Sequence, residues 1–262
     1  MGENYLEFAI STAKEAGRLL MRNHGKMQKL EWKLKTNFKT QVDDESDALI
    51  RGRIQGRFPQ HNIYSEENKD KLGRSRYSWV VDPLDGTIPY TYGFADHWGV
   101  CIALAKENEP IVGVIYAPLR KEMYYAEKGT GAFCNSKRIK VGEQDNLNRS
   151  VVACGPGKEI PEFKRIDQLE FEKNLYSDNG VTITISTGCA SIPLAFVARG
   201  LIQGCVFPNL EPWDMAAGVI INKEAGARVT NLRGKEWELG DNSIITANPI
   251  LHKKIMNLLY DR

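Results

Sequence analysis

The residues best suited to chemistry are two aspartates that stand three positions apart at the end of an apolar run, Asp82 and Asp85. A strand through this run would deliver Asp82 at its carboxyl end, and Pro83 would turn the chain so that Asp85 returns beside Asp82. Carboxylate oxygens suit Mg²⁺, and the backbone N–H groups of Gly86 and Thr87, where a short helix could begin, suit a phosphate. The pattern therefore predicts a site for a metal ion and a phosphate group.

Two distant segments add further carboxylates. Glu66 and Glu67 close another short apolar run, and Asp214 stands at an expected helix start. In an extended segment Glu67 would face away from Glu66, which makes it the weaker ligand candidate. Taken alone, Asp82 and Asp85 also fit a Pro-containing turn stabilised by their own side chains. Because converging carboxylates repel one another unless cations neutralise them, the combination favours bound metal.

Three motifs, in this order and at this spacing, resemble those of a known family: Glu66-Glu67, then Asp82 to Thr87, then Trp213 to Gly218. The family is that of the inositol-monophosphatase-like phosphatases, which are Mg²⁺-dependent and lithium-sensitive and include fructose bisphosphatases and bisphosphate nucleotidases. The resemblance covers essentially the whole chain. It implies a layered α-β-α-β-α sandwich, a cytoplasmic homodimer and a small phosphorylated substrate.

The resemblance also implies a set of metal ligands. Glu66 and Asp82 would bind a first Mg²⁺ together with the backbone carbonyl of Leu84, and Asp82, Asp85 and Asp214 would bind a second. Two or three Mg²⁺ ions per site are expected, which would clamp the attacking and leaving oxygens of an in-line displacement.

The catalytic residues that the resemblance implies are Asp43, Thr87 and the ligand Glu66. Thr87 would hydrogen-bond the attacking water, and the element from Thr40 to Asp43 would supply the aspartate that pairs with this threonine. Asp43 is also suited simply to cap the helix expected after it, a role that needs no chemistry.

Contacts to the substrate or its phosphate are expected from six residues: Asp85, Gly86, Thr87, Gly188, Ala190 and Asp214. For Gly188 and Ala190 an alternative is equally good, namely a tight turn and a small residue packed under a helix. Cys189 is expected to pack rather than to act as a nucleophile, because a metal-dependent hydrolase needs no thiol.

Two positions depart from the family pattern and bear on the substrate. Ile88-Pro89-Tyr90 follows Thr87, and Phe207 stands seven residues before Asp214, where animal inositol monophosphatases carry an acidic residue. Glu211 could replace that acid only if the loop before it folds inward. A hydroxyl-rich ring would lose its acidic partner at Phe207, but the resemblance still makes inositol monophosphate the default substrate. A fructose 1,6-bisphosphate or a 3'(2'),5'-bisphosphate nucleotide is the alternative.

A second phosphate would call for a basic side chain on the substrate wall. Candidates in the sequence are Lys164, Arg165 and Arg199. A different class of function also stays open, a non-catalytic binding or regulatory protein on the same fold.

The bulk composition narrows the choice of partner. The 262 residues include 35 basic and 33 acidic ones, so a net charge of +2 gives no reason to expect a nucleic acid or an anionic membrane as partner. The five cysteines are odd in number and widely spaced, as in reduced core residues of a cytosolic protein. No signal peptide or membrane span is expected.

Apolar periodicity predicts an α+β or α/β fold. Amphipathic helices are expected over residues 5–23 and from Asp43 to about residue 57, and an antiparallel meander over residues 98–141. Strands and helices then alternate. We therefore expect an α+β half over residues 1–146, which holds most metal ligands, and an α/β half over residues 147–262, which completes the site.

Overall fold

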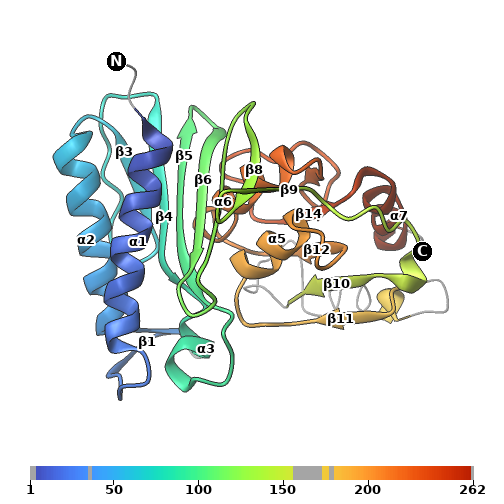
Figure 1. The fold of residues 1–262 in the computed structure, drawn as a ribbon, viewed down its shortest axis with the longest axis horizontal. Helices are drawn as coiled ribbons and strands as arrows, with labels where there is room; N and C mark the ends of the chain where they lie inside the picture. Colours follow the sequence, from blue (N-terminus) through green and yellow to red (C-terminus); the bar gives the residue numbers. More distant parts are fainter. Residues whose placement is uncertain (1–3, 35–36, 156–172, 177–179, 261–262) are drawn as a thin grey trace.

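The computed structural model describes residues 4–34, 37–155, 173–176 and 180–260 of the chain. Its first layer consists of two helices, α1 (Tyr5–Asn23) and α2 (Gln41–Arg57), which pack on one face of a seven-stranded sheet (Figure 1). The expected boundaries of the first helix are confirmed. The second helix starts earlier than expected, because Thr40 is its N-cap and Asp43 is its third residue.

The seven-stranded sheet contains the expected antiparallel meander. Its order is β3-β4-β5-β6-β7-β8-β9, and only the β3–β4 pair is parallel. The strands are β3 (Asn62–Ser65), β4 (Tyr77–Asp85), β5 (Gly99–Lys106), β6 (Glu109–Ala117), β7 (Glu122–Glu127), β8 (Gly131–Cys134) and β9 (Lys137–Ile139).

A second, five-stranded sheet lies in the C-terminal half, in the order β11-β10-β12-β14-β13. It is mixed, because β10 pairs in parallel with β11 and β12 whereas β14 is antiparallel to β12 and β13. After the short 3-10 helix η1 (Leu147–Arg149), its strands are β10 (Val151–Cys154), β11 (Ile183–Ile185), β12 (Gly204–Phe207), β13 (Arg228–Thr230) and β14 (Ile244–Ala247).

Two helices fill the space between the sheets, and a third covers the outer face (Figure 1). The inner pair is α5 (Ser191–Ala198) and α6 (Pro212–Glu224), and the outer helix is α7 (Pro249–Tyr260). A Cβ atom at Gly113 of β6 would lie 2.6 Å from the carbonyl oxygen of Ala217, so only glycine lets α6 sit this close to the first sheet. The layered mixed α/β sandwich is therefore confirmed, with one hydrophobic core shared by residues from both halves of the chain.

Sequence reasoning missed one pair of strands. The strands β1 (Leu30–Leu34) and β2 (Asn37–Thr40) are antiparallel and lead directly into α2. The short helix α3 (Thr87–Tyr92) lies nearby (Figure 1). Within the described part of the chain, no helix combines the length and the apolar character that crossing a membrane requires.

Candidate metal centre

Asp82 and Asp85 come together through a β-bulge rather than through the turn that the sequence predicted. Strand β4 continues through both residues, with Asp82 opposite Cys101 and Asp85 opposite Gly99 on β5. Two residues separate the aspartates on β4 and one separates their partners on β5, so β4 carries one extra residue. Asp85 does lie beside Asp82, as predicted, but the predicted turn at Pro83 is wrong, because the strand ladder resumes after the bulge.

Three carboxylates meet at this bulge. Ligand oxygens of Asp82, Asp85 and Asp214 all lie within 4.8 Å of one another. Asp214 arrives from the first turn of α6, as expected, and accepts a hydrogen bond from the backbone N–H of Glu211 at 2.8 Å. Two segments that are distant in sequence, the end of β4 and the start of α6, therefore converge on one point.

Asp82 is the most deeply buried member, with 1% of its surface exposed. Burial raises its pKa well above the usual range, and the negative charges of Glu66, Asp85 and Asp214 raise it further. One of its oxygens accepts the N–H of Leu84 at 3.0 Å, which only partly offsets this rise. The protein groups around Asp82 therefore disfavour its negatively charged form.

Asp85 is held by the start of α5. Its Oδ2 atom accepts the backbone N–H of Ser191 at 2.6 Å, that of Ala190 at 3.1 Å and the thiol of Cys189 at 2.9 Å. The preceding Gly188 has a φ of 70°, a left-handed conformation that favours glycine. Cys189 is a buried packing residue, as expected, and it also orients a ligand candidate.

Glu66 lies beside this group, close enough for its charge to raise the pKa of Asp82. Lys33 of β1 pairs with it at 3.3 Å and with Glu67 at 2.7 Å. Burial and the charge of Glu66 raise the pKa of Glu67 to about 7. Sequence reasoning missed Lys33, since nothing in the sequence indicates that β1 reaches this site.

Asp43 contacts both of its expected neighbours. Its Oδ2 atom accepts the backbone N–H of Thr40 at 2.8 Å and the Thr40 hydroxyl at 2.5 Å, and its Oδ1 atom accepts the Thr87 hydroxyl at 3.1 Å. The Thr87 hydroxyl also lies 3.2 Å from the carbonyl oxygen of Leu84, the predicted backbone ligand. Burial raises the pKa of Asp43 to about 6.

Gly86 connects Asp85 to α3 in a left-handed conformation, with a φ of 87°. A Cβ atom there would lie 2.5 Å from the carbonyl oxygen of His97, so both the conformation and the space require glycine. Gly86 thus lets the chain pass directly from Asp85 into α3.

Two further residues of α2 support the site and were also missed. Ser46 donates to the carbonyl oxygen of Pro83 at 3.0 Å. The buried Asp47 accepts the hydroxyl of Ser65 and, at 2.6 Å, the side-chain amide of Asn68. A signal did exist, because positions 43, 46 and 47 recur at helical spacing on one face.

The donor set fits a hard divalent cation. All three converging side chains offer oxygen, the element that Mg²⁺ prefers. The raised pKa of the buried Asp82 marks negative charge that a cation would neutralise. Residues and electrostatics therefore agree with the metal that the motifs predict.

A cavity of about 230 Å³ opens beside the carboxylates. Its described lining residues are Asp85, Gly155, Ser186, Thr187, Gly188, Cys189, Ala190, Phe207, Leu210 and Asp214. The segment before α6 thus turns Leu210, not Glu211, toward the cavity. Arg199 lines a different groove and pairs with Glu122 at 2.6 Å, whereas Lys164 and Arg165 lie outside the described residues.

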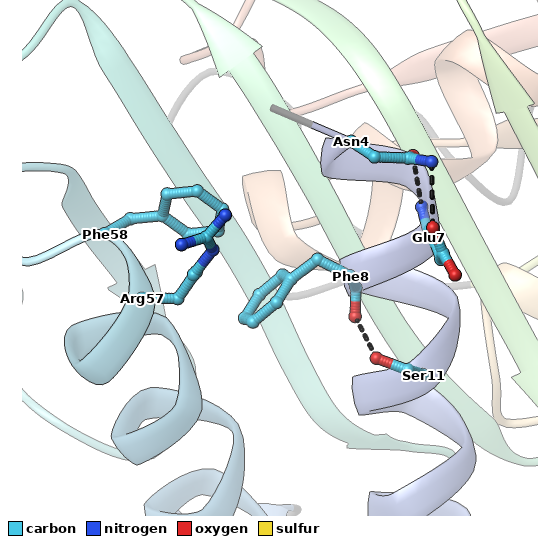
Figure 2. Close-up of a pocket in the computed structure, with 6 residues that line it drawn as sticks. All are labelled: Asn4, Glu7, Phe8, Ser11, Arg57 and Phe58. Carbon is cyan, nitrogen blue, oxygen red and sulfur yellow. Dashed lines mark hydrogen bonds between the residues drawn. The ribbon is translucent and has the colours of Figure 1, made fainter. Parts of the chain in front are cut away.

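A second cavity lies between the start of α1 and the end of α2, and Figure 2 shows it. Asn4 and Glu7 hydrogen-bond each other there as part of the cap of α1, and Ser11 donates to the carbonyl oxygen of Phe8. These polar groups serve the helix itself, so the cavity lacks the convergence of ligands seen at Asp82.

The fold and this centre define a class, a layered α/β protein with a buried carboxylate site suited to divalent metal. The model of the inositol monophosphatase family matches residues 1–262, and the chain belongs to this family. The fructose-1,6-bisphosphatase/inositol-1-monophosphatase of Aquifex aeolicus is 36% identical over 260 residues, which cover 98% of this chain and 95% of that protein.

Two further relatives widen the comparison. The putative Nus factor SuhB of Neisseria meningitidis serogroup A is 30% identical over 262 residues, covering 97% of each chain. The structure of the Thermotoga maritima IMPase matches with a TM-score of 0.86 and 30% identity, and covers 99% of this chain and 98% of that one. The relatives of this chain therefore carry phosphatase names in some cases and the name Nus factor in others.

Proposed function

We propose that this protein is a Mg²⁺-dependent phosphomonoesterase that hydrolyses a small polyol, sugar or nucleotide phosphate, with inositol monophosphate as the default substrate. The observation that carries the proposal is the convergence of Asp82, Asp85 and Asp214 within 4.8 Å, beside Glu66. Fructose 1,6-bisphosphate and 3'(2'),5'-bisphosphate nucleotides are the alternative substrates.

The proposed ligands fall into two groups that share Asp82. Glu66, Asp82 and the Leu84 carbonyl would hold one Mg²⁺. Asp82, Asp85 and Asp214 would hold a second. The number of ions bound per site, two or three, is to be measured by titration. When bound, the cations would neutralise the charge of the transferring phosphoryl group and lower the pKa of the attacking water.

The chain's own groups would orient that water and the phosphate. The Thr87 hydroxyl donates to Asp43, so the lone pairs of its oxygen point outward and can accept a hydrogen bond from the attacking water. The N–H groups of Gly86 and Thr87 would contact the phosphate. Gly188 and Ala190 line the cavity where the leaving alcohol would lie.

The test is phosphate release from inositol 1-phosphate, fructose 1,6-bisphosphate and adenosine 3',5'-bisphosphate with Mg²⁺, with EDTA, and with Mg²⁺ plus Li⁺. The proposal requires turnover of at least one ester that EDTA abolishes and Li⁺ inhibits. A folded protein that binds Mg²⁺ and releases no phosphate from any of them would contradict it.

A non-catalytic regulatory role is the second candidate, and one observation favours it: some relatives are named as Nus factors. The complete carboxylate set argues for catalysis, because a pure binding protein needs no buried, mutually repelling acids. The same assay separates the two, since a pure binding protein releases no phosphate. A cytoplasmic homodimer is proposed on family resemblance alone.

A further inference from the structure

The two helices between the sheets, α5 and α6, both begin at the carboxylate centre. The backbone N–H groups of Ala190 and Ser191 at the start of α5 hold Asp85, and Asp214 lies in the first turn of α6. The distance between Asp85 and Asp214 therefore depends on how these two helices pack against each other. All eight residues of α5 are buried, so its position is fixed by packing on every side.

The two helices come closest at Gly218. This residue lies four positions after Asp214, which is about 6 Å along the axis of α6. A Cβ atom there would lie 2.6 Å from Cδ1 and 2.9 Å from Cβ of Leu194 in α5. Leu194 in turn lies three positions after Ser191. Glycine thus permits close packing of the helices about one turn beyond the residues that form the site.

A buried amide joins the helices at the next turn of α6. Asn222 is fully buried, and its Nδ2 atom donates to the carbonyl oxygens of Leu194 and Gly218, each at 2.9 Å. Because a carbonyl oxygen can only accept, these two bonds fix the orientation of the amide. Its Oδ1 atom is then buried without a hydrogen-bond partner among the described residues. A buried acceptor without a partner costs stability, so the amide is poorly explained by stability alone.

We propose that Asn222 is a positioning residue for the metal centre, because it links α5 to α6 and so sets the separation of Asp85 and Asp214. The inference rests on the proposed function, since these two aspartates are ligands of the second proposed Mg²⁺. Mg²⁺ requires nearly octahedral oxygens at about 2.0–2.1 Å, whereas Ca²⁺ accepts a flexible shell at about 2.3–2.6 Å. A link that fixes the separation of two ligands therefore favours Mg²⁺ over Ca²⁺.

Asn222→Ser tests the link between the helices. A serine hydroxyl can bond the carbonyl four residues before it, here that of Gly218, but its side chain is one bond shorter than the amide and loses Leu194. Calorimetric titration without substrate gives the dissociation constants for Mg²⁺ and Ca²⁺. Mg²⁺ binding should weaken about tenfold and Ca²⁺ binding by less than about threefold. Partial unfolding would weaken the binding of both ions alike, so the ratio of the constants reports position rather than stability.

Asn222→Leu is a second variant, in case the smaller serine side chain leaves a cavity that the fold does not tolerate. Leucine keeps the branched shape and removes the oxygen that lacks a partner, together with both hydrogen bonds. The same change in the ratio of the two dissociation constants is expected.

Asn248→Ser is the matched control. The Nδ2 atom of Asn248 also donates to two carbonyl oxygens of another segment, those of Gly142 at 3.2 Å and Gln144 at 2.6 Å. Its Oδ1 atom accepts the N–H of Leu251 at the start of α7, a cap that serine can keep. This variant should leave the ratio of the two dissociation constants at the wild-type value.

An unchanged ratio in the folded Asn222 variants would overturn the inference, as would an equal change in Asn248→Ser. Neither result would touch the phosphatase function, which phosphate release by the wild type tests separately. A wild type that binds no Mg²⁺ would overturn both.

Discussion

Asp43 serves two neighbours through its two oxygens. One oxygen completes the capping box with Thr40 at the start of α2, and the other accepts the Thr87 hydroxyl. The sequence allowed a helix cap or a catalytic partner, and the geometry is compatible with both at once. The cap fixes the carboxylate, and the fixed carboxylate orients the hydroxyl.

Asp43→Asn tests the second of these roles. An amide can keep one acceptor for the Thr40 N–H but then presents its NH₂ group to Thr87, whose proton must turn away. We expect kcat to fall about a hundredfold or more, with KM little changed, because water orientation is lost and substrate contacts are kept. Urea unfolding should shift by only about 1 kcal/mol, the usual value of a cap. An unchanged kcat would reduce Asp43 to a helix cap.

At the scale of elements, helix α2 forms hydrogen bonds to both of the segments that carry ligand candidates. Ser46 holds the carbonyl of Pro83 in the bulge of β4, and Asp47 holds Ser65 and Asn68 on either side of Glu66. Because these residues lie within one turn of one helix, the two segments keep a fixed separation.

Asp47→Asn should weaken the connection between α2 and the segment that carries Glu66. The amide cannot accept from both Ser65 and Asn68 as the carboxylate does, so the segment with Glu66 gains freedom. Calorimetric titration should show several-fold weaker Mg²⁺ binding, and unfolding should cost about 1–3 kcal/mol less. Asp44→Asn is the control, since Asp44 lies on the same helix with a 42% exposed side chain and pairs with Lys39. Equal Mg²⁺ affinity in both variants would contradict the role of Asp47 in fixing the segment around Glu66.

The regular elements could be predicted from the sequence, and their irregular junctions could not. Helix α1 was predicted over its whole length, because its apolar stripe and polar face are strong local signals. The bulge in β4 was mistaken for a turn, because Asp-Pro is typical of turns and only pairing with β5 reveals a continuing strand. The contact of Lys33 with Glu66 depends on where the β1–β2 pair lies relative to the segment after β3, which no local pattern encodes.

At the scale of the whole molecule, the carboxylate centre is a source of instability that metal should relieve. Asp82 is buried where sheets and helices meet, and the charges around it raise its pKa. A raised carboxyl pKa means that folding works against ionisation of the group. The fold should therefore be less stable without metal than its packing allows.

Asp82→Asn should consequently raise the stability of the metal-free protein, by about 1 kcal/mol or more, because the amide carries no charge. Mg²⁺ should then stabilise the wild type and leave the variant unchanged. Urea unfolding with EDTA and with Mg²⁺ checks both expectations. A variant that is less stable than the wild type in EDTA would show that Asp82 is held favourably without metal.

His252 of α7 makes the outermost layer sensitive to acid. Burial lowers its pKa to about 4, aided by the charge of Arg228 and opposed by that of Glu236, and its ring lies 2.9 Å from the Thr230 hydroxyl. The unfolded chain protonates this histidine near pH 6.5, whereas the folded protein does so only near pH 4, so its contribution to stability is present above pH 6.5 and is lost as the pH falls toward 4.

Between pH 7 and pH 5 this difference corresponds to about 2 kcal/mol. His252→Gln should therefore lose about that much less stability than the wild type over the same interval, measured by urea unfolding at the two pH values. Parallel losses in the two proteins would show that His252 is protonated in the folded state as readily as in the unfolded chain.

The central claim is that phosphate ester hydrolysis depends on metal held by Asp82, Asp85 and Asp214. The measurement that tests it most directly is the rate of phosphate release as Mg²⁺ is titrated into the wild type and into Asp214→Asn, with the best ester found for the wild type. The account predicts saturable activation of the wild type and a loss of at least about a thousandfold in the folded variant. Full activity in Asp214→Asn, or wild-type activity that persists in EDTA, would contradict it.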